Sequence, residues 1–317
     1  MSKKGYTVTD PQEIYRLLYE PSQITIQGLL LQREVERNNL VGIQLRYIEC
    51  GNVLELELIP IFKKRVAGFE NQTIAIDSEK RAEMIARANK KHRQRYFVRL
   101  INTNFTDGDT IAHLGYDDAH LPTDMKSAKK FFSLYIDRLR RYAKKVGINF
   151  KYIYVTEVGL ERGRIHHHFI CNLPRDIVKA QWKGGNPQRD RFDEAVTDEL
   201  GITGFATYIT EDKNLDKSTG DKKWERDKYE KSYVPSLNLE QPTTRTANTK
   251  ISRRQAAAIA TDDNMAKDVF ERLYPDWRFI DKRVSWSDVI SGCYIYIRMS
   301  RRRKKSKKEI FQKPRKP

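Results

Sequence analysis

The chain has 317 residues, a formal net charge of +18 and a sequence pI of about 9.7. This excess of positive charge predicts a polyanionic partner, with nucleic acid first and an anionic membrane surface second. Cys50, Cys171 and Cys293 form no Cys-x-x-Cys pair, which argues against a zinc knuckle and against a disulfide framework. No apolar run is long enough to span a bilayer, and the first residues lack the apolar segment of a signal peptide. We expect a soluble protein of a reducing cytoplasm that binds no membrane.

The C-terminal tail carries half of the net charge. From Arg301 to Lys316 there are ten basic residues and one acidic residue, Glu309. A run of this kind predicts disorder until the tail meets nucleic acid, over residues 300–317. We expect it to contact DNA through Arg301, Arg302 and Arg303.

Residues 1–75 predict a small β-rich N-terminal region. Leu40–Glu49 and Val53–Phe62 have the composition of strands, and Gly51-Asn52 between them is a hairpin turn signal. We expect residues 76–299 to form the main domain, ending in a strand over Ser291–Met299 that returns to its central sheet.

The next segment, from Ser78 to about Arg95, predicts a strongly basic helix. A solvated helix face explains such a charge run as well as a phosphate-binding surface does, so both interpretations stay open. The candidate DNA-binding residues here are Arg87, Lys90, Lys91, Arg93 and Arg95. Two extended segments follow, at Tyr96–Phe105 and Thr110–Tyr116, and within the second we expect His113 to be an ordinary strand residue.

Thr123–Val146 has the clearest helical pattern, with apolar residues at three- and four-residue steps, Thr123 as its cap and Gly147 as its end. Two strand-like runs follow it, Tyr152–Gly159 and Gly163–Cys171. This order predicts an α+β protein with a ferredoxin-like, RRM-like split β-α-β-β core: a central antiparallel sheet with helices on one side. Further on we expect helices at Arg175–Trp182, Asp190–Leu200 and Met265–Tyr274, with a polar connector over Thr243–Asn264.

Three consecutive histidines lie on the second of these strands. Because side chains alternate along a strand, His166 and His168 share one face and His167 lies on the other. Two imidazoles about 7 Å apart on one face can bind a metal ion, and Glu157 on the preceding strand is placed to be a third ligand. A structural histidine run is the plainer alternative.

This pattern resembles that of the HUH endonucleases, and more closely the rolling-circle replication initiators of small phages and plasmids. The resemblance is carried by the His-x-His strand, the preceding acidic residue and Gly163-Arg164 just before the histidines, and it spans roughly residues 80–300. His167 departs from the family, where an apolar residue is usual, so the ligands are His166 with His168 or an adjacent pair. Arg164 is expected to contact DNA.

The resemblance implies a nucleophilic tyrosine on a helix downstream of the histidines, with a lysine three residues further on. Tyr208 matches the tyrosine, but Glu211 holds the place of the lysine and the nearest lysine is Lys213. Tyr229 and Tyr233 are the alternatives. The segment from Ser236 to Pro242 is similar to a Ser-x-Asn-Leu-x-x-Pro stretch of phage-type initiators.

The activity that the resemblance implies is metal-assisted nicking of single-stranded origin DNA. It would proceed through a 5′-phosphotyrosine intermediate, with Mg²⁺ or Mn²⁺ as cofactor and rejoining at the same site. The chain contains no phosphate-binding loop of the Gly-x-x-x-x-Gly-Lys-Ser/Thr type, so a host helicase and polymerase are expected partners. The rivals are a relaxase or transposase with the same chemistry, a non-catalytic nucleic-acid-binding protein, and a metal-stabilised structural domain.

Overall fold

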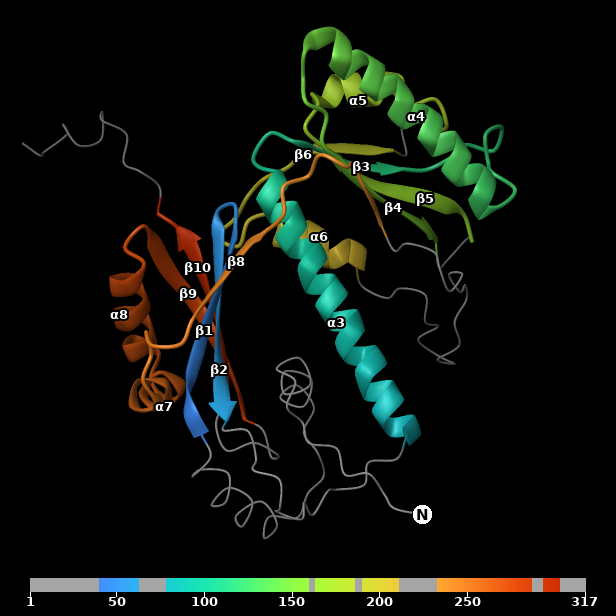
Figure 1. The fold of residues 1–317 in the computed structure, drawn as a ribbon. Helices are drawn as coiled ribbons and strands as arrows, with labels where there is room; N and C mark the ends of the chain where they lie inside the picture. The colour runs from blue at the N-terminus through green and yellow to red at the C-terminus, as the bar shows by residue number, and fades with distance from the viewer. Residues whose placement is uncertain are drawn as a thin grey trace, which may run out of the picture. The chain divides into compact units, whose positions relative to one another are not determined.

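The computed structural model describes residues 40–62, 78–159, 163–185, 190–210, 233–286 and 293–302. The chain divides into two compact units, Met1–His92 with Thr243–Pro317, and Arg93–Pro242 (Figure 1). Among the described residues, no helix is long and apolar enough to cross a bilayer. The expected domain boundary at residue 75 and the tail beyond residue 302 lie outside the described residues, so the predicted domain division stays a prediction.

The first unit is built on a five-stranded antiparallel sheet with the strand order β8-β1-β2-β10-β9. The strands are β1 (Leu40–Cys50), β2 (Val53–Phe62), β8 (Thr243–Ala247), β9 (Trp277–Trp286) and β10 (Cys293–Arg301). Strict alternation puts Leu54, Leu56 and Leu58 of β2 on one face, where they share a core with Phe270 of α8 (Asp263–Leu273). The predicted hairpin between β1 and β2 is confirmed, and Gly51 adopts its positive φ of 58°.

Two predictions for this unit are wrong. The strand expected to return to the central sheet, β10, pairs with β2 and β9, because Ile295, Ile297 and Met299 complete the core of the first unit. It also extends to Arg301, beyond the expected start of a disordered tail at residue 300. The expected polar connector forms β8 and helix α7 (Arg253–Thr261), and α7 buries Ala256 and Ile259.

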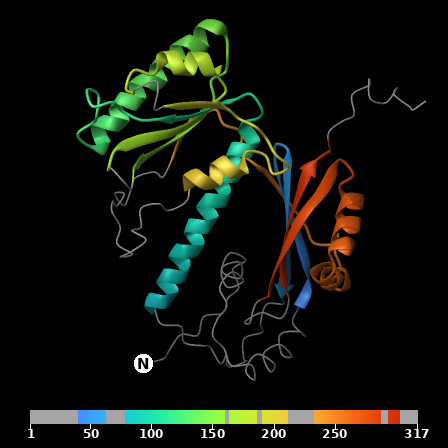
Figure 2. The ribbon, with the colours of Figure 1, turned by 180° about the vertical axis from the view of Figure 1, so that it is seen from behind.

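The second unit holds another five-stranded antiparallel sheet, in the order β6-β3-β5-β4-β7. Its strands are β3 (Thr110–Leu114), β4 (Tyr152–Val158), β5 (Ile165–Cys171), β6 (Arg191–Glu194) and β7 (Val234–Pro235). Helices α4 (Met125–Val146) and α5 (Arg175–Gln181) cover one face; α6 (Thr203–Thr210) and the end of α3 (Ser78–Asn104) pack on the other (Figures 1 and 2). The predicted α+β class with its β-α-β-β core is confirmed.

Helix α4 is capped at both ends. Its N-cap is Asp124 and not Thr123, because the Asp124 carboxylate accepts a hydrogen bond from the Ser127 N–H while the Ser127 side chain returns to the cap backbone. Gly147 ends the helix in the left-handed conformation, at φ 73°. The predicted helix is therefore confirmed, with its first turn shifted.

Two local predictions in this unit are wrong. Tyr96–Phe105 belongs almost wholly to α3, because Phe97, Leu100 and Ile101 recur at helical spacing and are buried against the sheet. Asp190–Leu200 contains the short strand β6, which pairs with β3, where a helix was expected.

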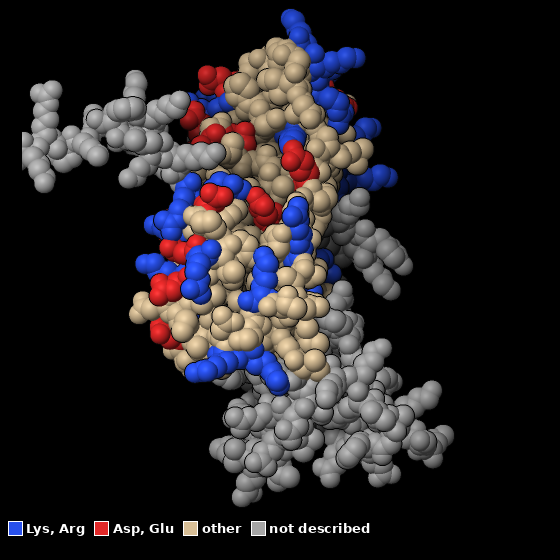
Figure 3. Space-filling view, turned by 60° about the vertical axis from the view of Figure 1, so that its left-hand side comes forward, with Lys and Arg blue, Asp and Glu red and all other residues tan. Residues whose placement is uncertain are grey.

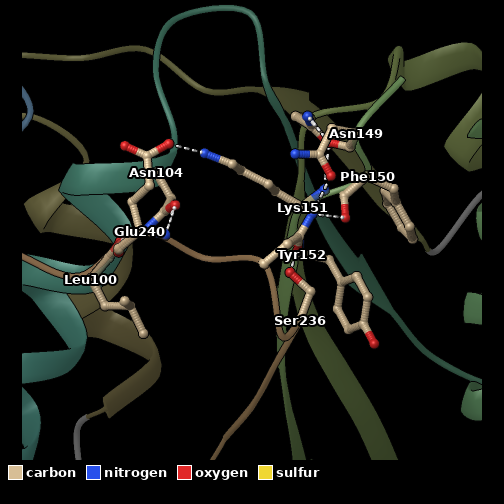
Figure 4. Close-up of polar contacts among 10 residues, drawn as sticks. Leu100, Asn104, Asn149, Phe150, Lys151, Tyr152, Ser236 and Glu240 are labelled. Carbon is tan, nitrogen blue, oxygen red and sulfur yellow. Dashed lines mark hydrogen bonds and ion pairs between the residues drawn. The ribbon is translucent and has the colours of Figure 1, made fainter. Parts of the chain in front are cut away.

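The segment expected to resemble phage initiators is fastened to the start of β4. The Ser236 N–H donates to the Tyr152 carbonyl at 2.8 Å, and the Tyr152 N–H donates to Ser236 Oγ at 3.1 Å (Figure 4). Asn238 Nδ2 donates to the Phe150 carbonyl at 3.1 Å. The Ser and Asn of this motif thus hold the chain in place beside the sheet.

Its next residue pair joins the end of α3. The Glu240 N–H donates to Asn104 Oδ1, and Asn104 Nδ2 donates to the Glu240 carbonyl, both at 2.8 Å (Figure 4). The Glu240 carboxylate also binds Lys151 Nζ at 2.7 Å. The segment therefore links α3 to β4 across one edge of the unit.

Candidate metal centre

Three neighbouring strands of the second unit bring three histidines together. The register of the sheet sets His113 of β3 opposite His168 of β5, and His166 of β5 opposite Glu157 of β4. One nitrogen from each of His113, His166 and His168 lies within 4.8 Å of the others. His113 Nδ1 is 3.4 Å from His168 Nδ1. This is the spacing of a chelating cluster.

The Glu157 side chain completes the group. Its Oε2 atom lies 3.4 Å from His168 Nε2 and 3.8 Å from His166 Nε2. Glu157 is only 8% exposed, and His168 is 3% exposed. A carboxylate so enclosed is stabilised by neighbouring cationic or metal-bound groups, because burial disfavours an isolated negative charge.

The alternation of the strands explains why these side chains share a face. Val155, Ile111 and Ile170 lie at the same parity as the cluster residues and pack in the core formed with α3 and α6. The histidine face is therefore the face of the sheet on which α6 lies. The core of the opposite face contains residues of α4 and α5.

His167 points to that opposite face and is fully buried. Its Nε2 lies 2.7 Å from the Tyr116 hydroxyl and its Nδ1 lies 2.9 Å from Thr156 Oγ1. The ring stacks on Phe132 with centroids 4.1 Å apart. Burial holds the pKa of His167 well below its usual value, so the ring is neutral. Both ring nitrogens are engaged in the core, and the pair that faces the cluster is His166 with His168.

The hairpin that precedes the histidines helps to orient His166. The Gly159 N–H donates to the Arg164 carbonyl at 2.8 Å, and His166 Nδ1 lies 3.4 Å from the same oxygen. A Cβ atom at Gly159 would lie 3.3 Å from that carbonyl and 3.7 Å from His166 Nδ1. A glycine here allows the strands to close tightly and leaves His166 Nε2 on the side of Glu157.

The donor set fits a divalent metal ion. Three imidazole nitrogens and one carboxylate oxygen converge, which is a mixture suited to Mn²⁺, Fe²⁺, Co²⁺ or Zn²⁺ and less to Mg²⁺, which prefers oxygen. The expectation that His113 is an ordinary strand residue is wrong, since it lies in the cluster. The available signal was its position, because His113 has the same parity as Ile111 on a strand that flanks the histidine strand.

The expected nucleophile lies on the helix that packs on this face. Tyr208 belongs to α6, whose Ile202 flank and Ala206 are buried in the core beneath the histidine face. The Tyr208 side chain, Lys213 and Tyr229 lie outside the described residues. The remaining alternative, Tyr233, packs against Phe97 with ring centroids 4.6 Å apart, and burial raises its pKa.

Asn102 of α3 holds the start of α6. Its Oδ1 accepts from the Ile202 N–H at 2.8 Å, and its Nδ2 donates to Thr203 Oγ1 at 3.1 Å. The same amide lies 3.3 Å from the Leu200 carbonyl. Asn102 is buried, so these bonds fix the helix that carries Tyr208 relative to the sheet.

The expected DNA-binding arginines have different surroundings. Arg164 donates to the Tyr116 carbonyl and pairs with Asp118, at the end of β5 nearest the histidines. Arg93 is exposed on α3, whereas Arg95 is partly buried. Three other candidates lie on the backbone of α3 with side chains outside the description: Arg87, Lys90 and Lys91.

The first tail arginines are bound to the sheet of the first unit. The guanidinium of Arg301 lies 4.5 Å from the centroid of the Trp277 ring and pairs with Glu49. Arg302 donates to the Trp277 carbonyl at 3.2 Å and pairs with Glu271. Arg303 lies outside the described residues. A DNA-binding role for these three residues stays a prediction.

Comparison with known proteins gives one match. Residues 110–217, about a third of the chain, match the family model of the replication-associated protein ORF2. The matched stretch contains the whole histidine cluster, Glu157 and Tyr208. No curated protein and no solved structure matches the chain.

Proposed function

We propose that this protein is a rolling-circle replication initiator of the HUH type, which nicks single-stranded origin DNA and rejoins it. The observation that carries the proposal is the cluster of His113, His166, His168 and Glu157, which lies within the stretch similar to replication-associated proteins. The net charge of +18 supports a nucleic acid as the substrate.

The cluster supplies what cleavage of a phosphodiester requires first. The three histidines and Glu157 hold a divalent ion, with Mn²⁺ or Mg²⁺ as the physiological candidates. Such an ion, when bound, acts as a Lewis acid on a non-bridging oxygen of the scissile phosphate. Arg164, close to the same strand, adds positive charge for the DNA backbone.

Tyr208 is the proposed nucleophile. Its phenolic oxygen attacks the phosphorus, the bond to the 3′ oxygen breaks, and the products are a 5′-phosphotyrosine and a free 3′-OH, which takes up a proton. The reverse attack by a 3′-OH restores the DNA and the tyrosine. The ordinary pKa of tyrosine is about 10, so a proton acceptor or a cation must assist, and Lys213 is the candidate cation.

The structural support for Tyr208 is the position of α6. The helix packs on the face of the sheet that carries the histidines, and Asn102 fixes its first turn. Burial raises the pKa of Tyr233, and its ring contacts Phe97, which makes it the poorer nucleophile. The remaining parts of the proposal are a host helicase and polymerase as partners and the host cytoplasm as the location.

A trapping experiment tests the proposal. Purified protein is incubated with end-labelled single-stranded origin DNA and Mn²⁺, and the products are separated on a denaturing gel. We expect a cut and a covalent protein–DNA adduct with wild type and with Tyr233→Phe, and neither with Tyr208→Phe or with chelator.

The alternatives give different results. An adduct that survives Tyr208→Phe but is lost in Tyr233→Phe moves the nucleophile to Tyr233. A relaxase or transposase cuts its own transfer or transposon-end sequence and leaves the replication origin intact. Metal-independent DNA binding with no cut on any of these strands would contradict the enzyme and favour a non-catalytic nucleic-acid-binding protein.

A further inference from the structure

The outer surface of α4 and α5 has a dense positive charge that the proposed cleavage does not use. Residues 125–146 and 175–183 contain eleven Lys and Arg side chains but two acidic ones, Asp137 and Asp176, a net charge of +9. That is half of the charge of the whole chain. The cations of α4 are Lys126, Lys129, Lys130, Arg138, Arg140, Arg141, Lys144 and Lys145.

Helix stability does not explain this arrangement. The first turn of α4 has no acidic residue and carries Lys126, although positive charge near a helix N-terminus is unfavourable. Like charges four residues apart also repel, by about 0.2–0.5 kcal/mol per pair. The helix has three such pairs: Lys126 with Lys130, Arg140 with Lys144, and Arg141 with Lys145. A polyanion would relieve this repulsion.

The surface suits phosphates better than bases. Binding of unpaired bases requires exposed aromatic rings for stacking. The aromatic residues of α4 face inward: Phe132 and Tyr135 are fully buried, and Phe131 packs edge to face against Trp182. The large apolar side chain that α4 exposes in its middle is Leu134. The chemistry of this surface is therefore electrostatic and independent of sequence.

The dimensions of the surface match duplex DNA. A 22-residue helix is about 33 Å long, close to the roughly 34 Å of one turn of B-DNA. In Figure 3, Lys and Arg side chains project from the upper part of the molecule, where Figure 1 places α4 and α5. The core that α4 and α5 form with the sheet lies on the face opposite the histidines.

We propose that the outer surface of α4 and α5 binds the phosphate backbone of double-stranded DNA. The histidine face and this surface lie on opposite sides of one sheet, so a single strand at the cluster and a duplex on the helices do not compete for space. Duplex binding of this kind is a second activity, separate from nicking, and it needs no metal.

The test uses the full chain and a fluorescent duplex of about 30 base pairs without origin sequence, in EDTA, over a series of salt concentrations. The variant Lys130→Gln with Lys145→Gln removes two exposed cations from α4. The matched control, Arg254→Gln with Lys267→Gln, removes two exposed cations from α7 and α8. We expect the α4 variant to bind several-fold more weakly, with the slope of log K against log salt reduced by about 2. The control should match wild type.

Other outcomes overturn the inference. Equal losses in the α4 variant and in the control would mean that only overall charge matters. Unchanged duplex affinity together with weaker binding to phosphatidylserine vesicles would assign the surface to a membrane. Thermal melting of both variants shows that each is folded. Cleavage of a short single-stranded origin oligonucleotide is measured in parallel, so loss of nicking in wild type would count against the proposed function and leave the duplex result standing.

Discussion

His113 and His168 face each other across the β3–β5 ladder with their Nδ1 atoms 3.4 Å apart. Two imidazole nitrogens at this distance either share a proton or direct their lone pairs at a common ion. The two rings are nearly perpendicular, with an interplanar angle of 67°. With Glu157 and His166 beside them, a shared ion accounts for the whole group, whereas a shared proton accounts for only one pair.

The first prediction concerns His113. We expect His113→Ala to weaken Mn²⁺ binding at least tenfold, because it removes one of the converging nitrogens. Titration calorimetry on the intact chain measures the affinity directly. His120→Ala is the matched control, since His120 is exposed and contacts Asp117 outside the cluster. Equal affinities in wild type and His113→Ala would restrict the site to His166, His168 and Glu157.

The second prediction separates His167 from its two neighbours. His167→Leu leaves the Tyr116 hydroxyl and Thr156 Oγ1 without their buried partner, so we expect a loss of about 1–3 kcal/mol in the free energy of unfolding. Mn²⁺ affinity should stay within about threefold of wild type. Urea denaturation and calorimetry measure the two quantities.

A double-mutant cycle makes this second prediction specific. Tyr116→Phe removes one partner of His167, so its effect and that of His167→Leu should be non-additive. Additive effects would mean that the hydrogen bond contributes little. A collapse of metal affinity in His167→Leu, with the protein still folded, would show that an adjacent histidine pair binds the ion.

The parts of the site that local pattern determines were predictable. Strand alternation alone puts His166 and His168 on one face and His167 on the other, and the hairpin register brings Glu157 beside them. His113 was not predictable in the same way, because its contact with His168 depends on which strand lies beside β5. Nothing within residues 110–114 determines that order.

The errors in the fold have similar causes. The run Tyr96-Phe97-Val98 has strand-like composition, but the burial of Phe97, Leu100 and Ile101 against the sheet stabilises a helix. The alternation in β10 predicts a strand but not its neighbours, and its place beside β2 is determined by the core of the first unit. Local composition specifies an element more strongly than it specifies the partner of that element.

The third prediction concerns Asn102 as a positioning residue. Asn102→Ala removes the bonds to the Ile202 N–H and Thr203 Oγ1, so α6 loses its fixed start. We expect a loss of about 1–3 kcal/mol in stability and a slower formation of the covalent adduct, with Mn²⁺ affinity unchanged. The trapping gel under single-turnover conditions gives the rate.

Asn104→Ala is the control for Asn102. It lies on the same helix and also removes two hydrogen bonds, but these hold Glu240. We expect a similar loss of stability with a normal rate of adduct formation. If both variants slow the adduct equally, the effect of Asn102 comes from general destabilisation and not from the position of α6.

The fourth prediction concerns pH and Asp190. This carboxyl accepts a hydrogen bond from the Gly115 N–H at 2.8 Å, and burial raises its pKa above the ordinary value despite that bond. A raised carboxyl pKa means that the folded state binds the proton more tightly than the unfolded state does. Its contribution to stability is therefore full below the unfolded pKa of about 3.9 and is lost as pH rises through the folded pKa.

Asp190→Asn keeps an oxygen for Gly115 and removes the charge, so we expect the variant to be more stable than wild type at pH 7. The difference should vanish as the pH falls towards 3, where Asp190 is neutral in both states. Urea denaturation of wild type and variant across this range measures the difference, and Asp193→Asn, exposed on β6, is the control. A variant less stable than wild type at pH 7 would show that the Asp190 charge is stabilising, which would reverse the role that its burial implies.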